Sequence, residues 1–145
     1  MLETYNYLNY ILKELINKYD ITTNLVFSNI KNNGVFGQFD HTTNSIVIDY
    51  DKCVSCNQDM INILHHEFRH RFQYKEYKDV YYWWLNPVRR EEYNANYFLP
   101  INCLEYDAYE FGNTYGASNK EAFLRYYNVK KLQYLYDSGL IKRNN

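Results

Sequence analysis

The chain has 145 residues and a formal net charge of −1 at pH 7, and 23% of its residues are charged. One domain over residues 1–145 is the expected organisation, because this length buries a sizeable core without division. The near-neutral charge and the lack of a basic block argue against a nucleic-acid partner. The longest apolar run, at residues 80–85, is too short to span a bilayer, so no membrane partner is expected.

The N-terminus and the cysteines indicate a compartment. No basic segment followed by an apolar run is present, so we expect no signal peptide and a cytoplasmic, reduced protein. Cys53 and Cys56 form half of a zinc-binding pattern, which Cys103 and His65 are the candidates to complete. We expect free thiols instead, because the second C-x-x-C half is missing.

The first third of the chain predicts one helix followed by three short strands. Apolar residues from Leu2 to Tyr19 recur at helical spacing. Strands are expected at 25–30, 35–39 and 45–50, separated by turn segments rich in Asn, Gly, Asp and Thr. Two consecutive hairpins would give a largely antiparallel sheet. The last strand is our candidate for an exposed edge, and a fully covered strand is the alternative.

A polar connector at 51–58 leads to a helix that starts near residues 57–59 and contains the pattern H-E-x-x-H, at His66-Glu67-Phe68-Arg69-His70. Each residue of an α-helix advances by about 100°, so His66 and His70 lie one turn apart on one face, with Glu67 beside them. The opposite face is apolar and consists of Ile61, Leu64, Phe68 and Phe72. Such a helix packs its back against a core and presents two imidazoles and a carboxylate to a cleft.

This spacing is typical of a catalytic zinc site. Two neutral imidazoles one turn apart can bind one Zn²⁺ at about 2.0–2.1 Å per bond. Glu67 can reach a water on the ion more easily than the ion itself, and is therefore the candidate catalytic base. His41 and His65 are poor further ligands, because the first lies in a turn and the second points away from the pair. A third ligand is nevertheless needed, and we expect a carboxylate from a later helix.

The chain after residue 73 is expected to be helical and aromatic, with a first segment that ends at 85–87. Further helices are predicted at 89–99, 104–112, 118–128 and 129–138, which would form a C-terminal helical subdomain. Pro100 stops the first of these and Gly112 closes the second. The aromatic run at 81–84 is a candidate apolar wall for a substrate, although packing in the core is the simpler interpretation.

Two windows in these helices share the pattern E-x-x-A-x-x-F, one beginning at Glu92 and the other at Glu105. In each window an alanine one turn later would let the helix approach the zinc helix closely. H-E-x-x-H followed by this pattern resembles the small gluzincin-type metallopeptidases of the ImmA/IrrE kind and their phage-encoded relatives. The resemblance covers about residues 25–112.

The resemblance implies an α+β, minimal zincin-like fold, with an N-terminal helix, a small three-stranded sheet, a zinc-binding helix and a ligand helix. It also implies a zinc-dependent hydrolase that cleaves a protein or peptide substrate in a bacterial cell, encoded by the host or by a phage. Peptides would add to the edge strand expected at 45–50 by backbone hydrogen bonding.

We favour Glu105 as the third metal ligand beside His66 and His70, because Pro100 restarts the chain just before it. Asp107 lies close enough in sequence to serve as an acceptor for a ligand histidine. Glu92 is the alternative ligand, followed by Asp107 and Glu110.

The sequence also offers candidates for the oxyanion donor and an alternative function. The tyrosines that could stabilise a developing oxyanion are Tyr74, Tyr77, Tyr109 and Tyr127. The same metal ligands also suit a module that binds a host partner without hydrolysis, as expected for some phage or mobile-element proteins. Replacement of Glu67 by Gln separates these two functions, because only hydrolysis needs the base.

Overall fold

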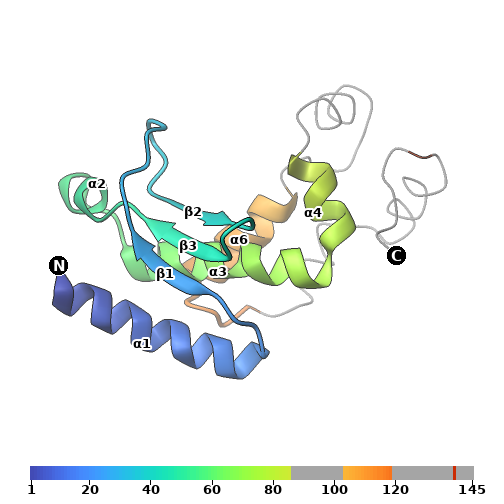
Figure 1. The fold of residues 1–145 in the computed structure, drawn as a ribbon, viewed down its shortest axis with the longest axis horizontal. Coiled ribbons are helices and arrows are strands. Elements are labelled where there is room, and N and C mark those ends of the chain that lie inside the picture. The colour runs from blue at the N-terminus through green and yellow to red at the C-terminus, as the bar shows by residue number, and fades with distance from the viewer. Residues whose placement is uncertain (86–102, 119–138, 140–145) are drawn as a thin grey trace.

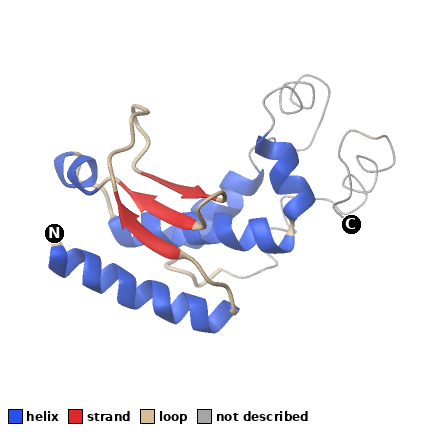
Figure 2. Cartoon of the chain, in the orientation of Figure 1, coloured by secondary structure: helices blue, strands red, loops and turns tan. Residues whose placement is uncertain are grey.

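A computed structural model of the chain describes residues 1–85, 103–118 and 139, and the statements below concern these residues. The fold is α+β, with helices arranged around a small three-stranded mixed sheet (Figures 1 and 2). In chain order the elements are α1 (Leu2–Tyr19), β1 (Asn24–Phe27), β2 (Gly37–Asp40), β3 (Ser45–Ile48), α2 (Tyr50–Ser55), α3 (Met60–Glu76), α4 (Lys78–Leu85) and α6 (Cys103–Asn113). None of the helices in these ranges is long and apolar enough to cross a membrane.

The sheet differs from the expected antiparallel meander. Its strand order is β1-β3-β2, in which β1 is parallel to β3 and β2 is antiparallel to β3. The expectation of an exposed edge at 45–50 is therefore wrong, since β3 is the central strand and β2 and β1 form the edges. The segment between β1 and β2 does not fold into a tight hairpin but crosses the end of β3.

Two side chains hold this crossing segment. Asp49 accepts a hydrogen bond from the main-chain N–H of Ile30 at 2.9 Å. The ammonium of Lys52 donates to the carbonyls of Ile30, Asn32 and Val35 at 2.6, 3.0 and 3.0 Å. In a tight hairpin, the main-chain N–H and C=O groups of the turn would bond to one another. Here the side chains of Asp49 and Lys52 bind them instead. The turn residues at 31–34 therefore shape a wide loop, and β2 pairs with β3 alone.

The short helix α2 occupies most of the polar connector expected at 51–58 and begins at Tyr50, which was expected to end the strand before it. Asp49 caps this helix, because its carboxylate accepts a hydrogen bond from the main-chain N–H of Lys52 at 3.1 Å. The helix buries Cys53 against the core, whereas Cys56 is exposed. Neither of these two thiols forms a disulfide within the described residues.

One face of the sheet packs on α1 and α3, and the core lies between them. The apolar side chains of this layer are Leu8, Leu12, Leu15, Leu25, Ile46, Ile48, Leu64, Phe68 and Phe72. α3 begins where the sequence indicates, because Asp59 accepts hydrogen bonds from the N–H groups of Ile61 and Asn62 at 3.0 and 3.3 Å. Its apolar face turns toward the sheet, so His66 and His70 face away from the core.

The later helices are described in part. α4 ends at Leu85, in agreement with the predicted end of the first segment, and lies at the other end of the sheet from α2 (Figure 1). α6 contains the helix expected at 104–112, but Gly112 lies inside this helix and does not close it. The helices expected at 89–99, 118–128 and 129–138 fall outside the described residues, apart from Ser118.

Candidate metal centre

α3 brings His66, Glu67 and His70 together in a buried cluster that could hold a metal ion, since their ligand atoms all lie within 4.8 Å of one another. The Nε2 atoms of the two histidines are 3.2 Å apart. The nearest carboxylate oxygen of Glu67 lies 3.8 Å from His66 Nε2. Helical spacing alone produces this arrangement. His66 and His70 lie one turn apart on the same face, and Glu67 is next to His66 in the chain.

α6 adds a carboxylate from a distant part of the sequence. Glu105 places one oxygen 2.6 Å from His70 Nε2 and the other 3.5 Å from His66 Nε2. Around a tetrahedral ion with bonds of about 2.0–2.1 Å, neighbouring ligand atoms are about 3.3 Å apart. The 3.2 Å between the two nitrogens and the 3.5 Å between Glu105 and His66 are close to this value, whereas the 2.6 Å contact between Glu105 and His70 is shorter and has the length of a hydrogen bond.

Charge at the centre favours a cation. Burial alone would lower the pKa of His70, but the hydrogen bond with Glu105 and the nearby charge of Glu67 raise it to about 9. Burial would raise the pKa of Glu105, but the contacts with His66 and His70 hold it well below its usual range. A positive charge between these groups is thus stabilised by carboxylates on two different helices.

α6 can approach α3 closely because small residues lie at the contact. Ala108 is completely buried. A Cβ atom on Gly112 would lie 2.8 Å from the carbonyl oxygen of Asn62 and 3.2 Å from His66 Cβ, so only glycine fits there. The side-chain amide of Asn62 also donates to the side-chain oxygen of Asn113 at 2.8 Å. This close packing is what places Glu105 beside the two imidazoles.

Asp107 does not have the direct contact with a ligand histidine that its sequence position suggests. Its two oxygens accept hydrogen bonds from the buried guanidinium of Arg69 at 2.7 and 3.1 Å. It also accepts from the amide of Gln73, and the oxygen of that amide lies 2.8 Å from His70 Nδ1. Asp107 therefore reaches His70 through Gln73, and its bonds to Arg69 make it a poor candidate for a ligand.

On the other side of α3, the sheet edge holds Glu67. Burial raises the pKa of this carboxyl, and the two histidines together with the main-chain N–H of Phe39 oppose the rise. A Cβ atom on Gly37 would lie 2.5 Å from Ile63 Cγ2 and 3.4 Å from Glu67 Cγ, so this strand packs directly over the helix. The backbone of β2 thus contributes directly to the placement of Glu67.

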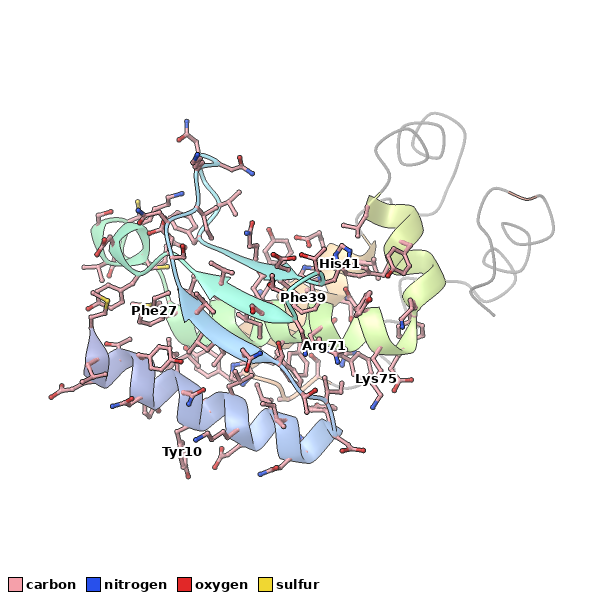
Figure 3. All side chains as sticks on the ribbon, in the orientation of Figure 1. Tyr10, Phe27, Phe39, His41, Arg71 and Lys75 are labelled. Atoms are coloured by element: carbon pink, nitrogen blue, oxygen red, sulfur yellow. The ribbon has the colours of Figure 1, made fainter. Side chains whose placement is uncertain are left out.

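A cavity of about 590 Å³ opens in front of these groups. Its walls come from the loop before β2, from β2, α3, α4 and α6. Residues along it include Val35, Gly37, Phe39, Ile63, Glu67, Tyr81, Leu85, Glu105 and Tyr109. Figure 3 shows Phe39 and His41 at the end of the sheet that faces α4.

The main chain of β2 faces this cavity. The N–H of Asp49 donates to the carbonyl of Phe36 at 2.9 Å, so this pair is hydrogen-bonded across the two strands. Because such pairs alternate along antiparallel strands, the N–H and C=O groups of Gly37 and Phe39 point away from β3. Gly37 and Phe39 both line the cavity. The exposed edge that the sequence assigned to 45–50 is therefore provided by β2.

The tyrosines proposed as oxyanion donors differ in their position relative to the cavity. Of Tyr74, Tyr77 and Tyr109, only Tyr109 lines the cavity, and its ring centroid lies 4.6 Å from that of His66. Tyr127 lies outside the described residues. Of the aromatic run at 81–84, Tyr81 is buried and also lines the cavity.

The other two histidines are not part of the centre, as expected. His65 Nδ1 lies 2.8 Å from the carbonyl oxygen of Ile61, and its ring stacks on Tyr115. His41 packs against three tyrosine rings, Tyr74, Tyr81 and Tyr82, and so connects the turn after β2 to α4. Glu92, the alternative third ligand, lies outside the described residues.

No family model, curated protein or solved structure matches this chain. The geometry of the centre is thus the basis of the functional argument. Three of its features were missed in the sequence: the role of Gln73, the close approach at Gly112 and the main-chain contact of Phe39. Only the first has a readable signal, since Gln73 follows His70 by three residues and must share its side of the helix.

Proposed function

We propose that this protein is a zinc-dependent peptidase of the gluzincin type, with His66, His70 and Glu105 as metal ligands and Glu67 as the catalytic base. One observation carries the proposal. Two imidazole nitrogens and a carboxylate from a second helix converge to between 2.6 and 3.5 Å, and a further buried carboxylate lies beside them. This combination provides three ligands and a separate base, which is what hydrolysis needs.

A bound zinc ion would lower the pKa of a coordinated water to near 7 and polarise the scissile carbonyl. Glu67 accepts the proton of the attacking water and later returns it to the leaving amine as the C–N bond breaks. Burial suits Glu67 to this role, because it raises the pKa of the carboxyl and makes it a stronger base than an exposed glutamate. The N–H of Phe39 keeps the carboxylate oriented toward the cavity.

A peptide is the substrate class best supported by the cavity. The main-chain groups of Gly37 and the C=O of Phe39 point away from β3 along one wall, where an extended peptide can add by backbone hydrogen bonding. Apolar side chains at Ile63, Tyr81 and Leu85 can accept substrate side chains on either side of the cleavage point.

Tyr109 is the candidate donor for the oxygen that becomes negative in the transition state. It lines the cavity beside His66, and the residue is 54% exposed. Burial and the two nearby glutamates raise the pKa of its hydroxyl, so it stays protonated and able to donate at neutral pH.

Replacement of Glu67 by Gln tests the proposal. The purified wild-type chain should bind one zinc ion and cleave members of a peptide library, as measured by mass spectrometry. In Glu67→Gln the zinc content should stay the same and the cleavage rate should fall by about 10²–10⁴-fold, the usual contribution of a general base. Glu76→Gln, an exposed position at the end of the same helix, is the matched control and should cleave normally.

Other outcomes would count against the proposal in different ways. A wild-type chain without zinc contradicts the metal centre. A chain that holds zinc but cleaves no peptide, with or without Glu67, supports the alternative of a non-hydrolytic binding module. Equal cleavage by the wild type and Glu67→Gln contradicts the role of the base.

A further inference from the structure

Gln73 is a completely buried amide next to the metal centre. It follows His70 by three residues on α3 and therefore lies on the same side of the helix, one turn further on. A buried amide is costly unless its polar atoms are hydrogen-bonded. The partners of Gln73 thus decide how this side chain is oriented.

The amide nitrogen of Gln73 has two partners, and both can only accept. It donates to the main-chain carbonyl of Leu104 at 2.9 Å and to a carboxylate oxygen of Asp107 at 2.9 Å. Rotation of the amide by 180° would place its oxygen against these two oxygens. The network therefore fixes which end of the amide is nitrogen.

Asp107 is itself held in place as an acceptor. Arg69 donates to both of its carboxylate oxygens, and both side chains are completely buried. The guanidinium carbon of Arg69 lies 4.3 Å from the ring centroid of Phe72 and 5.0 Å from that of Phe111. The group is packed between α3 and α6, so Gln73 has a rigid acceptor on the neighbouring helix.

The remaining end of the amide faces His70. Its oxygen lies 2.8 Å from His70 Nδ1, and an amide oxygen can only accept. His70 Nδ1 must therefore carry a hydrogen. In a neutral imidazole this leaves the lone pair on Nε2, the atom that faces His66 and Glu105.

We propose that Gln73, oriented by Asp107 and Leu104, is a positioning residue that fixes the tautomer and ring orientation of His70 so that Nε2 faces the metal. This inference rests on the proposed metal centre and adds a residue that acts only through His70. Partners of this kind typically change metal affinity by 10–100-fold when they are removed.

Gln73→Leu removes the acceptor and keeps a side chain of similar length. We expect the zinc affinity of this variant, measured by competition with a chromophoric chelator, to fall by 10–100-fold. Leu64→Ala is the matched control, since it truncates a buried apolar side chain of the same helix that has no part in the network. It should unfold at a lower temperature while its zinc affinity stays within twofold of the wild type.

The wild type offers a second test that does not depend on a variant that folds. Two-bond ¹H–¹⁵N correlation spectra of the zinc-loaded chain report which imidazole nitrogen is protonated. We expect hydrogen on Nδ1 of His70 and metal on Nε2. The opposite assignment overturns the inference, as does a Gln73→Leu protein that folds and binds zinc as tightly as the wild type.

These outcomes are distinguishable from a failure of the proposed function. A wild-type chain that binds no zinc overturns the metal centre and this inference together. A wild type that binds zinc while Gln73→Leu binds equally well overturns the inference alone. Loss of zinc affinity in both Gln73→Leu and Leu64→Ala also overturns it, because the effect then reflects a disturbed core.

Discussion

The two sides of α3 hold the centre by different means. On the side of α6 the contacts between side chains join residues 34 and 38 positions apart, through Gln73, Arg69 and Asp107. On the side of β2 the contact is with main chain, where Phe39 donates to Glu67 and Gly37 lies over the helix. A buried polar network thus positions the proposed metal ligands, and a strand edge positions the proposed base. Substitutions on one side should change metal binding, and those on the other should change turnover.

Glu105→Gln should have the largest effect. The amide loses the charge that pairs with His70, so zinc affinity should fall by more than about 100-fold and peptide cleavage should be lost. Isothermal titration with zinc measures the first effect and a peptide assay the second. Glu110→Gln on the same helix is the control. Normal zinc binding by Glu105→Gln combined with its loss in Glu92→Gln would transfer the ligand role to Glu92.

Tyr109→Phe should lower kcat by about 100-fold, the usual cost of one lost hydrogen-bond donor to a developing oxyanion. Zinc affinity and KM should change little, because the ring and its contact with His66 remain. Steady-state kinetics on one peptide substrate separate the two parameters. Tyr74→Phe, whose hydroxyl is bonded to that of Tyr82 outside the cavity wall, serves as the control. An equal loss in both variants would contradict a specific role for Tyr109.

Two glycine substitutions compare the sides directly. In Gly112→Ala the new methyl group meets the backbone of Asn62, so the helices must separate. We expect about 1–3 kcal/mol of lost stability in urea unfolding, together with weaker zinc binding. In Gly37→Ala the nearest obstacle is a side-chain methyl of Ile63, which can shift, so stability should fall less. In Gly37→Ala, zinc affinity should be unchanged and turnover reduced. Weaker zinc binding in Gly37→Ala with normal binding in Gly112→Ala would contradict the separate roles of α6 and β2.

Asp49→Asn should have the smallest effect. The N–H groups of Ile30 and Lys52 lower the pKa of this carboxyl below its ordinary value. Its contribution to stability is therefore present above about pH 4 and is lost as the pH falls through the lowered pKa. The variant should melt at a lower temperature than the wild type at pH 7, and the difference between the two melting temperatures should shrink as the pH falls below about 4. Asp51→Asn, an exposed change in the same helix, should show neither effect.

Local patterns predicted the elements of the centre that lie on one helix. Apolar periodicity predicted α1 and α3. The H-E-x-x-H spacing predicted that His66 and His70 share one face, because the two residues lie one helical turn apart. The start of α3 was also predictable, since Asp59 is a strong capping residue. These features depend on contacts between residues fewer than five positions apart.

The sheet order could not be predicted in the same way. The turn residues at 31–34 suggested a hairpin, but whether they form one depends on Asp49 and Lys52, which lie about 20 residues later. α2 was missed because a helix this short shows little periodicity, and its cap is visible only once the strand before it is placed. Long-range pairing of this kind leaves no local signal.

The third ligand was predictable only in part from local sequence. Glu105 and Glu92 fit the same local pattern, and what favours Glu105 is its contact with His66 and His70 across two helices. That contact depends on Gly112 and Asn62 as much as on the glutamate itself. A sequence pattern can therefore nominate both carboxylates, but packing is needed to choose between them.

Lys52 holds the loop before β2, which lines one side of the cavity, without the need for a bound ion from solution. Its ammonium occupies the point where three carbonyls of the loop before β2 converge, much as a bound potassium ion would, but it is covalently attached to the chain. A chelator that removes metal from the histidines should therefore leave this loop in shape. Acetylation of this lysine removes the charge and should release the loop while the histidines still bind metal. Reductive dimethylation keeps the charge but leaves only one N–H donor for the three carbonyls, so it should loosen the loop less.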